Sequence, residues 1–197
     1  TFLFTDIEGS TTLAQQYPAA LPALLARHHT ILHDAIEAHH GHVFQIIGDA
    51  FCAAFHTAPE ALNAALEAQR GLQHEAWHPA PLKVRMGLHT GVAQAGASDE
   101  RAGGYAGYST MARTQRVMSI AHGGQVLLSN ATAELLRDQL PAEVTLRDMN
   151  EHRLNGLAHP DHLWQLVAPG LAAEFPPLKS LTSMPNNLPL QLTSFVG

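Results

Sequence analysis

Two aspartates in this sequence each stand at the end of an otherwise apolar stretch. Asp6 follows residues 2–5, whose apolar and β-branched side chains are typical of a strand. Asp49 follows Gly48 inside the apolar stretch 43–55, a pattern that predicts two short strands joined by a tight turn. The two carboxylates converge if this hairpin lies beside the first strand. Because Mg²⁺ is typically held by one or two carboxylates together with substrate phosphates, the pair is a candidate metal site.

The turn after Asp6 has residues that suit a bound phosphate. Gly9 marks the turn, and Ser10 and Thr11 can cap the helix that follows it. Free backbone N–H groups and the helix dipole at such a terminus attract phosphate oxygens. This stretch alone also allows a plainer interpretation, in which a surface aspartate simply ends a strand.

The composition is that of an ordinary globular domain. The 197 residues are 46% hydrophobic and 14% charged, which suits one domain with a substantial core. The net charge of −6 and the lack of a basic run argue against nucleic acid and an anionic membrane surface as partners. No stretch approaches the roughly 18 consecutive apolar residues of a membrane span. The single cysteine, Cys52, is expected in the core; it excludes a disulfide framework and fits a reducing, cytoplasmic setting.

Strands alternate with helices along the chain, which predicts an α/β sheet of mixed direction with helices on its surface. The predicted helices cover residues 10–16, 19–39, 59 to about 74–77, 105–121 and 130–136. The predicted strands are 1–5, two within 43–55, 82–88, 92–94, 126–128, 144–149 and 163–167. Gly41 is expected to end the long helix, and residues 89–91 to turn one strand into its partner at 92–94. Residues 95–104 are small and polar, which predicts a mobile loop.

Four blocks of sequence carry a family resemblance. They are F-T-D-I-E-G-S-T at 4–11, G-D-A-F-C-A-A-F at 48–55, V-R-M-G-L-H-T-G-V-A at 84–93 and R-V-M-S-I-A-H-G-G-Q-V-L-L-S at 116–129. In this order they resemble the class III adenylate/guanylate cyclase catalytic domain. The resemblance implies a ferredoxin-like βαββαβ core with a mixed, mainly antiparallel sheet flanked by helices. It also implies conversion of ATP, or of GTP, to a 3′,5′-cyclic nucleotide and pyrophosphate in intracellular signalling.

The C-terminal residues 168–197 differ from the rest of the chain. They carry five prolines and no periodicity, which predicts a linker. Their ending, L-P-L-Q-L-T-S-F-V-G, resembles the segment that leads into an ATPase domain in multidomain bacterial regulators bearing this kind of cyclase domain. The resemblance therefore implies a catalytic domain at 1–167, a linker at 168–197 and a further domain beyond it.

The resemblance assigns both aspartates to metal ions. It implies two Mg²⁺ or Mn²⁺ ions in each site, held by Asp6, Asp49 and the backbone carbonyl of Ile7. The ions would lower the pKa of the ribose 3′-hydroxyl for its attack on the α-phosphorus. The β- and γ-phosphates would be held by the turn residues Glu8, Gly9, Ser10 and Thr11.

The family places its transition-state arginine in a helix, four residues after an asparagine that orients the ribose. Arg116 takes the position of the arginine here, and Arg113 is an alternative source of the positive charge. Ala112 stands where the asparagine is expected, a departure that leaves ribose positioning open. Polar neighbours that could supply the missing contact are Ser109, Thr110 and Gln115.

Two further positions read the purine base in the family. Gln45 takes the first, usually a lysine, and Tyr105 or its neighbour Gly104 takes the second. A glutamine can donate and accept hydrogen bonds, so the choice between ATP and GTP is left open. The resemblance also implies a homodimer, in which one chain supplies the acids of a site and the other the arginine. The departures keep a second function open: a degenerate cyclase domain that binds nucleotide or dimerises with little turnover.

Overall fold

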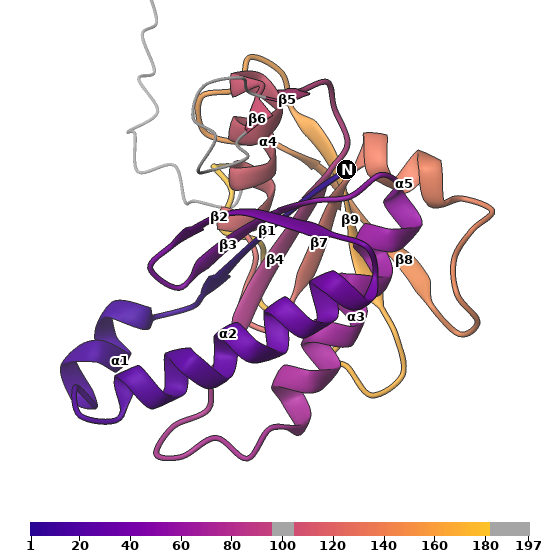
Figure 1. The fold of residues 1–197 in the computed structure, drawn as a ribbon. Helices are drawn as coiled ribbons and strands as arrows, with labels where there is room; N and C mark the ends of the chain where they lie inside the picture. Colours follow the sequence, from indigo (N-terminus) through magenta and orange to yellow (C-terminus); the bar gives the residue numbers. More distant parts are fainter. Residues whose placement is uncertain (96–104, 182–197) are drawn as a thin grey trace, which may run out of the picture.

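The protein is built around one seven-stranded sheet with the strand order β2-β3-β1-β4-β7-β9-β8. The computed structural model describes residues 1–95 and 105–181 (Figure 1). The strands of this sheet are β1 (Phe2–Ile7), β2 (His42–Ile47), β3 (Ala50–Ala54), β4 (Val84–His89), β7 (Val126–Ser129), β8 (Thr145–His152) and β9 (Asp161–Val167). Neighbouring strands of this described sheet run antiparallel except β4 and β7, which run parallel. The mixed, mainly antiparallel sheet predicted from the sequence is confirmed.

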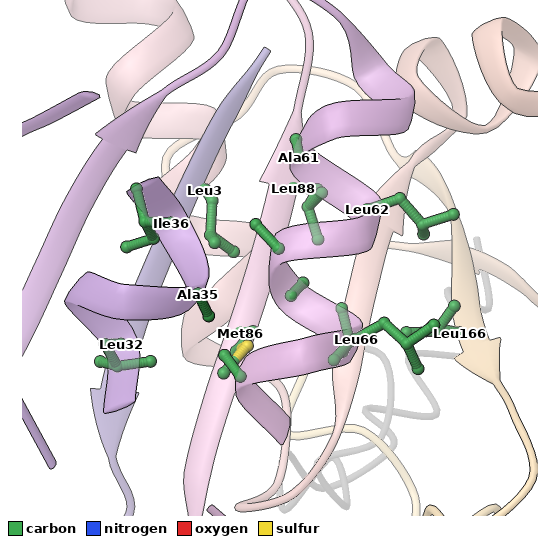
Figure 2. Close-up of a cluster of buried hydrophobic side chains, with 14 of the residues drawn as sticks. Leu3, Leu32, Ala35, Ile36, Ala61, Leu62, Leu66, Met86, Leu88 and Leu166 are labelled. Carbon is green, nitrogen blue, oxygen red and sulfur yellow. The ribbon is translucent and has the colours of Figure 1, made fainter. Parts of the chain in front are cut away.

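Helices cover both faces of the sheet (Figure 1). The described helices are α1 (Ser10–Gln16), α2 (Leu21–Ala38), α3 (Ala58–His74), α4 (Tyr108–Ser119) and α5 (Asn130–Leu136). Figure 2 shows the main core, where apolar side chains of α2 and α3 meet those of β1 and β4. Its labelled members are Leu3, Leu32, Ala35, Ile36, Ala61, Leu62, Leu66, Met86, Leu88 and Leu166.

Alternation along β1 decides on which face Asp6 lies. Leu3 packs in the main core beneath α2 and α3, whereas Phe2 and Phe4 pack in a second cluster with Met118 of α4. Successive side chains of a strand point to opposite faces of the sheet. Asp6 therefore shares the face that α4 covers.

A glycine in β4 allows α4 to lie very close to the sheet. A Cβ atom on Gly87 would lie 2.5 Å from the backbone nitrogen of Met118, so no larger residue fits there. The close approach brings the C-terminal end of α4 to the strand that neighbours Asp6.

The hairpin expected after β4 does not form. One edge of β4 is taken by β1 and the other by β7, so no edge is left for a partner strand at residues 92–94. The chain instead forms a separate short pair of β5 (Gln94–Ala95) with β6 (Tyr105–Ala106). The prediction was wrong because strand periodicity does not tell which neighbours a strand has.

The end of α2 also differs from the prediction. The helix ends at Ala38, and the left-handed conformation that commonly follows a helix is taken by His40, with φ 59°, and not by Gly41. Gly41 is required for a different reason, because a Cβ atom there would overlap the ring of Phe55.

Part of the predicted linker packs against the domain. Leu178 is 2% exposed and lies in a core cluster with Val117 and Leu154. Residues 168–181 thus run along the domain surface, whereas residues 182–197 and residues 96–104 of the loop predicted at 95–104 lie outside the described residues. Among the described helices, none combines the length and the apolar character that crossing a membrane requires.

Two histidines are sealed inside the protein. His28 of α2 is fully buried, and neither ring nitrogen has a hydrogen-bond partner within the described part of the chain. Burial and the neighbouring His29 lower the pKa of His28 to about 4, against an opposing effect of Asp49. His89 of β4 is also buried, and burial together with Arg113 lowers its pKa to about 4. Both imidazoles are therefore neutral in the folded protein at neutral pH.

We expect the free energy of unfolding to fall as the pH drops from 6.5, the ordinary histidine pKa, to about 4. In this window the unfolded chain binds protons that the folded protein does not, and each histidine costs on the order of 3 kcal/mol at the acidic end. Urea unfolding at pH 7.5 and pH 5 measures the loss. His28→Leu should lose less stability than the parent between these pH values, and an equal loss in both would contradict the assignment.

Candidate active site

The hairpin of β2 and β3 carries Asp49 to the end of β1. Gly48 takes a left-handed φ of 62° at the tip, which allows the tight turn. The Asp49 carboxylate accepts a 2.9 Å hydrogen bond from the backbone N–H of Ile7. Because Ile7 follows Asp6 directly, this bond brings the two acids to the same corner of the sheet.

Asp6 is held by an arginine from the adjacent strand. Arg85 lies opposite Asp6 in the register of β1 and β4 and donates to its Oδ2 from Nε at 2.9 Å and from Nη2 at 2.5 Å. Its Nη1 donates to the carbonyl oxygen of Ser119, the last residue of α4, at 3.0 Å. Arg85 therefore ties the carboxylate to the end of α4. Sequence reasoning did not identify this role, although the alternation of β4 places Arg85 on the face away from the main core.

The oxygens at this corner suit a hard divalent cation. Both bonds from Arg85 fall on Oδ2 of Asp6, and Ile7 bonds Oδ2 of Asp49, so each acid has a second oxygen outside these bonds. Within the described ranges, no group of three or more His, Cys, Asp or Glu side chains is arranged to hold a metal. Mg²⁺ prefers one or two carboxylates and takes its remaining ligands from water and substrate phosphates, so this donor set fits it.

The turn after β1 presents backbone N–H groups. Gly9, with φ 77°, is the N-cap of α1, and no side chain caps this helix, so the predicted capping by Ser10 and Thr11 is wrong. The helical hydrogen bonds begin with the N–H of Leu13, which donates to the carbonyl of Gly9. The N–H groups before it, in the first turn, have no acceptor within the helix and face outward from its start.

The backbone and the side chain of Glu8 both form hydrogen bonds within the protein. Its N–H donates to the carbonyl of Lys83 at 2.9 Å, and its carboxylate accepts hydrogen bonds from the Gly123 N–H, at 2.8 Å, and from Lys179. Burial acts to raise the pKa of Glu8, but the hydrogen bonds from Lys179 and Gly123 outweigh it, and the pKa is lowered. These bonds give no support to the predicted phosphate contact of Glu8. They make Glu8 an anchor of the turn.

A β-bulge places Gln45 on the face of the sheet that carries Asp6. Val43 pairs with Ala53, whereas Gln45 pairs with Cys52, so the register shifts by one residue between them. Cys52 packs in the cluster beneath α4, and Gln45 shares its face. Without the bulge Gln45 would point to the opposite face, under α2. The exposed Gln45 thus lies on the side where the predicted nucleotide would bind.

The two arginines of α4 have different surroundings. Arg113 donates to Asp161 at 2.8 Å; burial raises the pKa of this carboxyl, against the opposing effect of Arg113. Arg116 donates to the carbonyl oxygens of Asn155 and Ala112, and no carboxylate pairs with it among residues 1–95 and 105–181. The charge of Arg113 is therefore neutralised by a carboxylate, whereas no carboxylate of the described chain neutralises the charge of Arg116.

Three polar residues on α4 are the candidates to replace the asparagine missing at Ala112. Thr110 is buried, and its hydroxyl donates to the carbonyl of Val92 at 2.7 Å, so this hydroxyl is not available to a ligand. Ser109 and Gln115 are exposed and therefore accessible to a ligand. The structure narrows the candidates to these two side chains.

The second predicted base contact involves Tyr105 or Gly104. Tyr105 begins β6, but its side chain is not described, and Gly104 lies outside the described residues. Its role stays a prediction.

The family model described as "Adenylate and Guanylate cyclase catalytic domain" matches residues 1–167. An uncharacterized protein of Mycobacterium tuberculosis is 40% identical over 200 residues; the match covers 100% of this chain, which spans 66% of the length of that relative. A receptor-type adenylate cyclase of Trypanosoma brucei brucei is 27% identical over 204 residues, which cover 84% of this chain and 16% of that protein.

Solved structures share the fold. An adenylate cyclase from Trypanosoma brucei in its monomeric state has a TM-score of 0.78 at 27% identity and covers 90% of this chain and 91% of its own. The guanylate cyclase domain of RhGC from Catenaria anguillulae, in complex with GTP, has a TM-score of 0.74 at 17% identity and covers 85% of this chain and 94% of its own. The second likeness shows the fold alone.

We expect Arg113→Met to lower the free energy of unfolding by about 1–2 kcal/mol, because it leaves the largely buried Asp161 without its cation. Arg116→Met breaks only bonds to carbonyl oxygens and should cost under about 0.5 kcal/mol. Chemical unfolding of both variants beside the parent measures the difference. Equal losses would contradict a structural role for Arg113 and a free charge on Arg116.

Proposed function

The chain belongs to the family of adenylate and guanylate cyclase catalytic domains, and we propose that it converts ATP or GTP to the 3′,5′-cyclic nucleotide and pyrophosphate. The observation that carries this proposal is the hydrogen bond from the Ile7 N–H to Asp49, which holds Asp49 beside Asp6. Two carboxylates at one corner are what a divalent-ion-dependent attack on a phosphorus atom needs.

Asp6, Asp49 and the carbonyl of Ile7 would hold two Mg²⁺ or Mn²⁺ ions. Ions bound there would lower the pKa of the ribose 3′-hydroxyl and neutralise charge on the triphosphate. The backbone N–H groups of residues 9–11 would bind the β- and γ-phosphates, since they lie at the start of α1, which follows Asp6 and Ile7 in the chain. Glu8 would hold this turn in place through the bonds described above.

Arg116 would come from a second copy of the chain, in a head-to-tail homodimer with two sites. Its support is the charge of Arg116, which no acid of the described chain neutralises and which suits the charge that develops on the phosphate. Exposed apolar side chains occur both near Asp49 and on α4, the helix that carries Arg116. Ile47 is 62% exposed, and Tyr108, the first residue of α4, is 88% exposed. A partner chain would cover such side chains.

Gln45 would read the purine edge, because the bulge in β2 turns it to the face of Asp6. Its amide offers both a donor and an acceptor, and it can present either one to adenine or guanine by turning about its last bond. We therefore propose weak discrimination between ATP and GTP.

A second candidate function is a nucleotide-binding module with little turnover. The observation that favours it is Ala112, since an alanine cannot hydrogen bond the ribose through its side chain. Loss of ribose orientation would slow the attack while leaving the metal and phosphate contacts intact.

We expect the purified chain with Mn²⁺ to form cyclic nucleotide from ATP, from GTP or from both. Asp49→Asn should reduce turnover roughly 100-fold or more, because the amide can still accept the bond from Ile7 but holds the cations poorly. Arg116→Ala should cause a similar loss. Product is measured chromatographically, and stabilisation of the fold by nucleotide is measured by thermal unfolding.

Mixing the two inactive variants tests the shared site. Random exchange of subunits makes half of the dimers mixed, and each mixed dimer has one intact site, so about a quarter of the parent turnover should return. No recovery in a mixture that demonstrably exchanges subunits would refute the shared site. Stabilisation by nucleotide without product would favour the second function, and neither response would exclude both.

We expect Ala112→Asn to raise turnover several-fold, on the order of the two- to tenfold change that one well-placed hydrogen bond supplies. The variant returns to α4 the amide that the family uses for the ribose. The comparison of kcat and KM with the parent, and with Ala112→Leu as a control of similar size, measures it. An unchanged or lower kcat in Ala112→Asn would show that Ser109, Gln115 or another group already makes this contact.

A further inference from the structure

A strap formed by residues 171–181 crosses the domain surface after the last strand and contacts the turn that follows β1. Lys179 pairs with the Glu8 carboxylate through its ammonium group, which also donates to the carbonyl of Ala121 at 3.3 Å. The backbone N–H of Lys179 donates to the carbonyl of Ile120 at 3.0 Å. The strap lies beyond residue 167, where the match to the family ends.

The contact is fixed on both sides of Lys179. Leu178 is 2% exposed in a core cluster, and Ser180 is 1% exposed and hydrogen bonded to His152 at 2.8 Å. On the N-terminal side, Phe175 stacks on His122 with an angle of 8° between the ring planes. The backbone around Lys179 therefore has little freedom, and its side chain is directed to Glu8 by the packing of its neighbours.

Glu8 links the contact with Lys179 to the proposed metal and phosphate site. Glu8 stands between Ile7, which we assign to the metals, and Gly9, which begins the phosphate turn. Its N–H and its carboxylate are both bonded to the domain; in the described structure Lys179 is the cation hydrogen bonded to that carboxylate, and the His122 ring nitrogen lies 3.9 Å from it. Without Lys179, an acid beside the proposed polyphosphate site would lose its hydrogen-bonded cation and one of its anchors.

We propose that Lys179 is a positioning residue for the metal and phosphate turn, acting through Glu8, and that the working catalytic unit includes the strap to residue 181. This inference rests on the proposed function. The pair is half-exposed, with side-chain exposures of 38% for Lys179 and 35% for Glu8. Exposed pairs add little to stability, so the effect of Lys179 falls on the geometry of the turn and not on the fold.

The test compares variants of the full chain. Lys179→Met should raise the KM for Mn²⁺–ATP about twofold to fivefold, with the unfolding midpoint nearly unchanged. Lys179→Arg should retain the parent KM because it keeps the charge. Glu174→Gln is the matched control, since Glu174 lies on the same strap and pairs at 2.9 Å with Arg147, away from Glu8. A KM for Lys179→Met equal to that of Glu174→Gln would overturn the proposal.

A double-mutant cycle checks the route through Glu8. If Lys179 acts through that carboxylate, Lys179→Met should change KM little in a chain that already carries Glu8→Gln. A full, additive effect in this background would overturn the route.

A second readout does not need turnover. Hydrogen exchange of a peptide covering residues 8–16, followed by mass spectrometry, should be faster in Lys179→Met than in the parent and in Glu174→Gln. If the parent forms no cyclic product, the proposed function fails and this comparison alone decides the role of the strap. Equal exchange in all three chains would overturn it, and faster exchange in Lys179→Met alone would support it.

Discussion

The hydrogen bond between the Ile7 N–H and the Asp49 carboxylate is the constraint on which the rest of the site depends. It joins residues 42 positions apart, and it fixes the tip of a hairpin against the end of a strand. Pairing of β3 with β1 sets the register, and the left-handed Gly48 lets the turn be tight enough for Asp49 to reach back. Any slip of this pairing would move the two acids apart, because a one-residue shift sends a side chain to the other face.

The same corner is linked to the arginine helix by packing and charge. Gly87 allows α4 to approach the sheet, and Arg85 bridges the Asp6 carboxylate and the carbonyl of Ser119. The same guanidinium places a positive charge directly beside the Asp6 carboxylate. One arginine thus supports the acid and fixes the end of the helix that carries Arg116.

The departure from the family pattern at Ala112 lies on α4, away from the corner that we propose to bind metals. Ala112 has no polar side-chain group, while Asp6, Asp49 and the turn at Gly9 are in place. The strap adds a contact outside the matched family region, from Lys179 to Glu8. The alanine at position 112 and the strap contact to Glu8 are therefore both separate from the assembly of the two acids.

Local patterns in the sequence determined most of the element types, a sheet of mixed direction and the two acids, because alternation, helical periodicity and Gly-Asp turns are short-range signals. The mainly antiparallel arrangement was predicted by the family resemblance. Tertiary structure alone decided the rest. The bulge that turns Gln45, the edges of β4 that exclude a hairpin, the pairing of Arg85 with Asp6 and the packing of the strap all join residues distant in the chain. Such contacts depend on which surfaces meet after folding, and a local pattern carries no information about its distant partner.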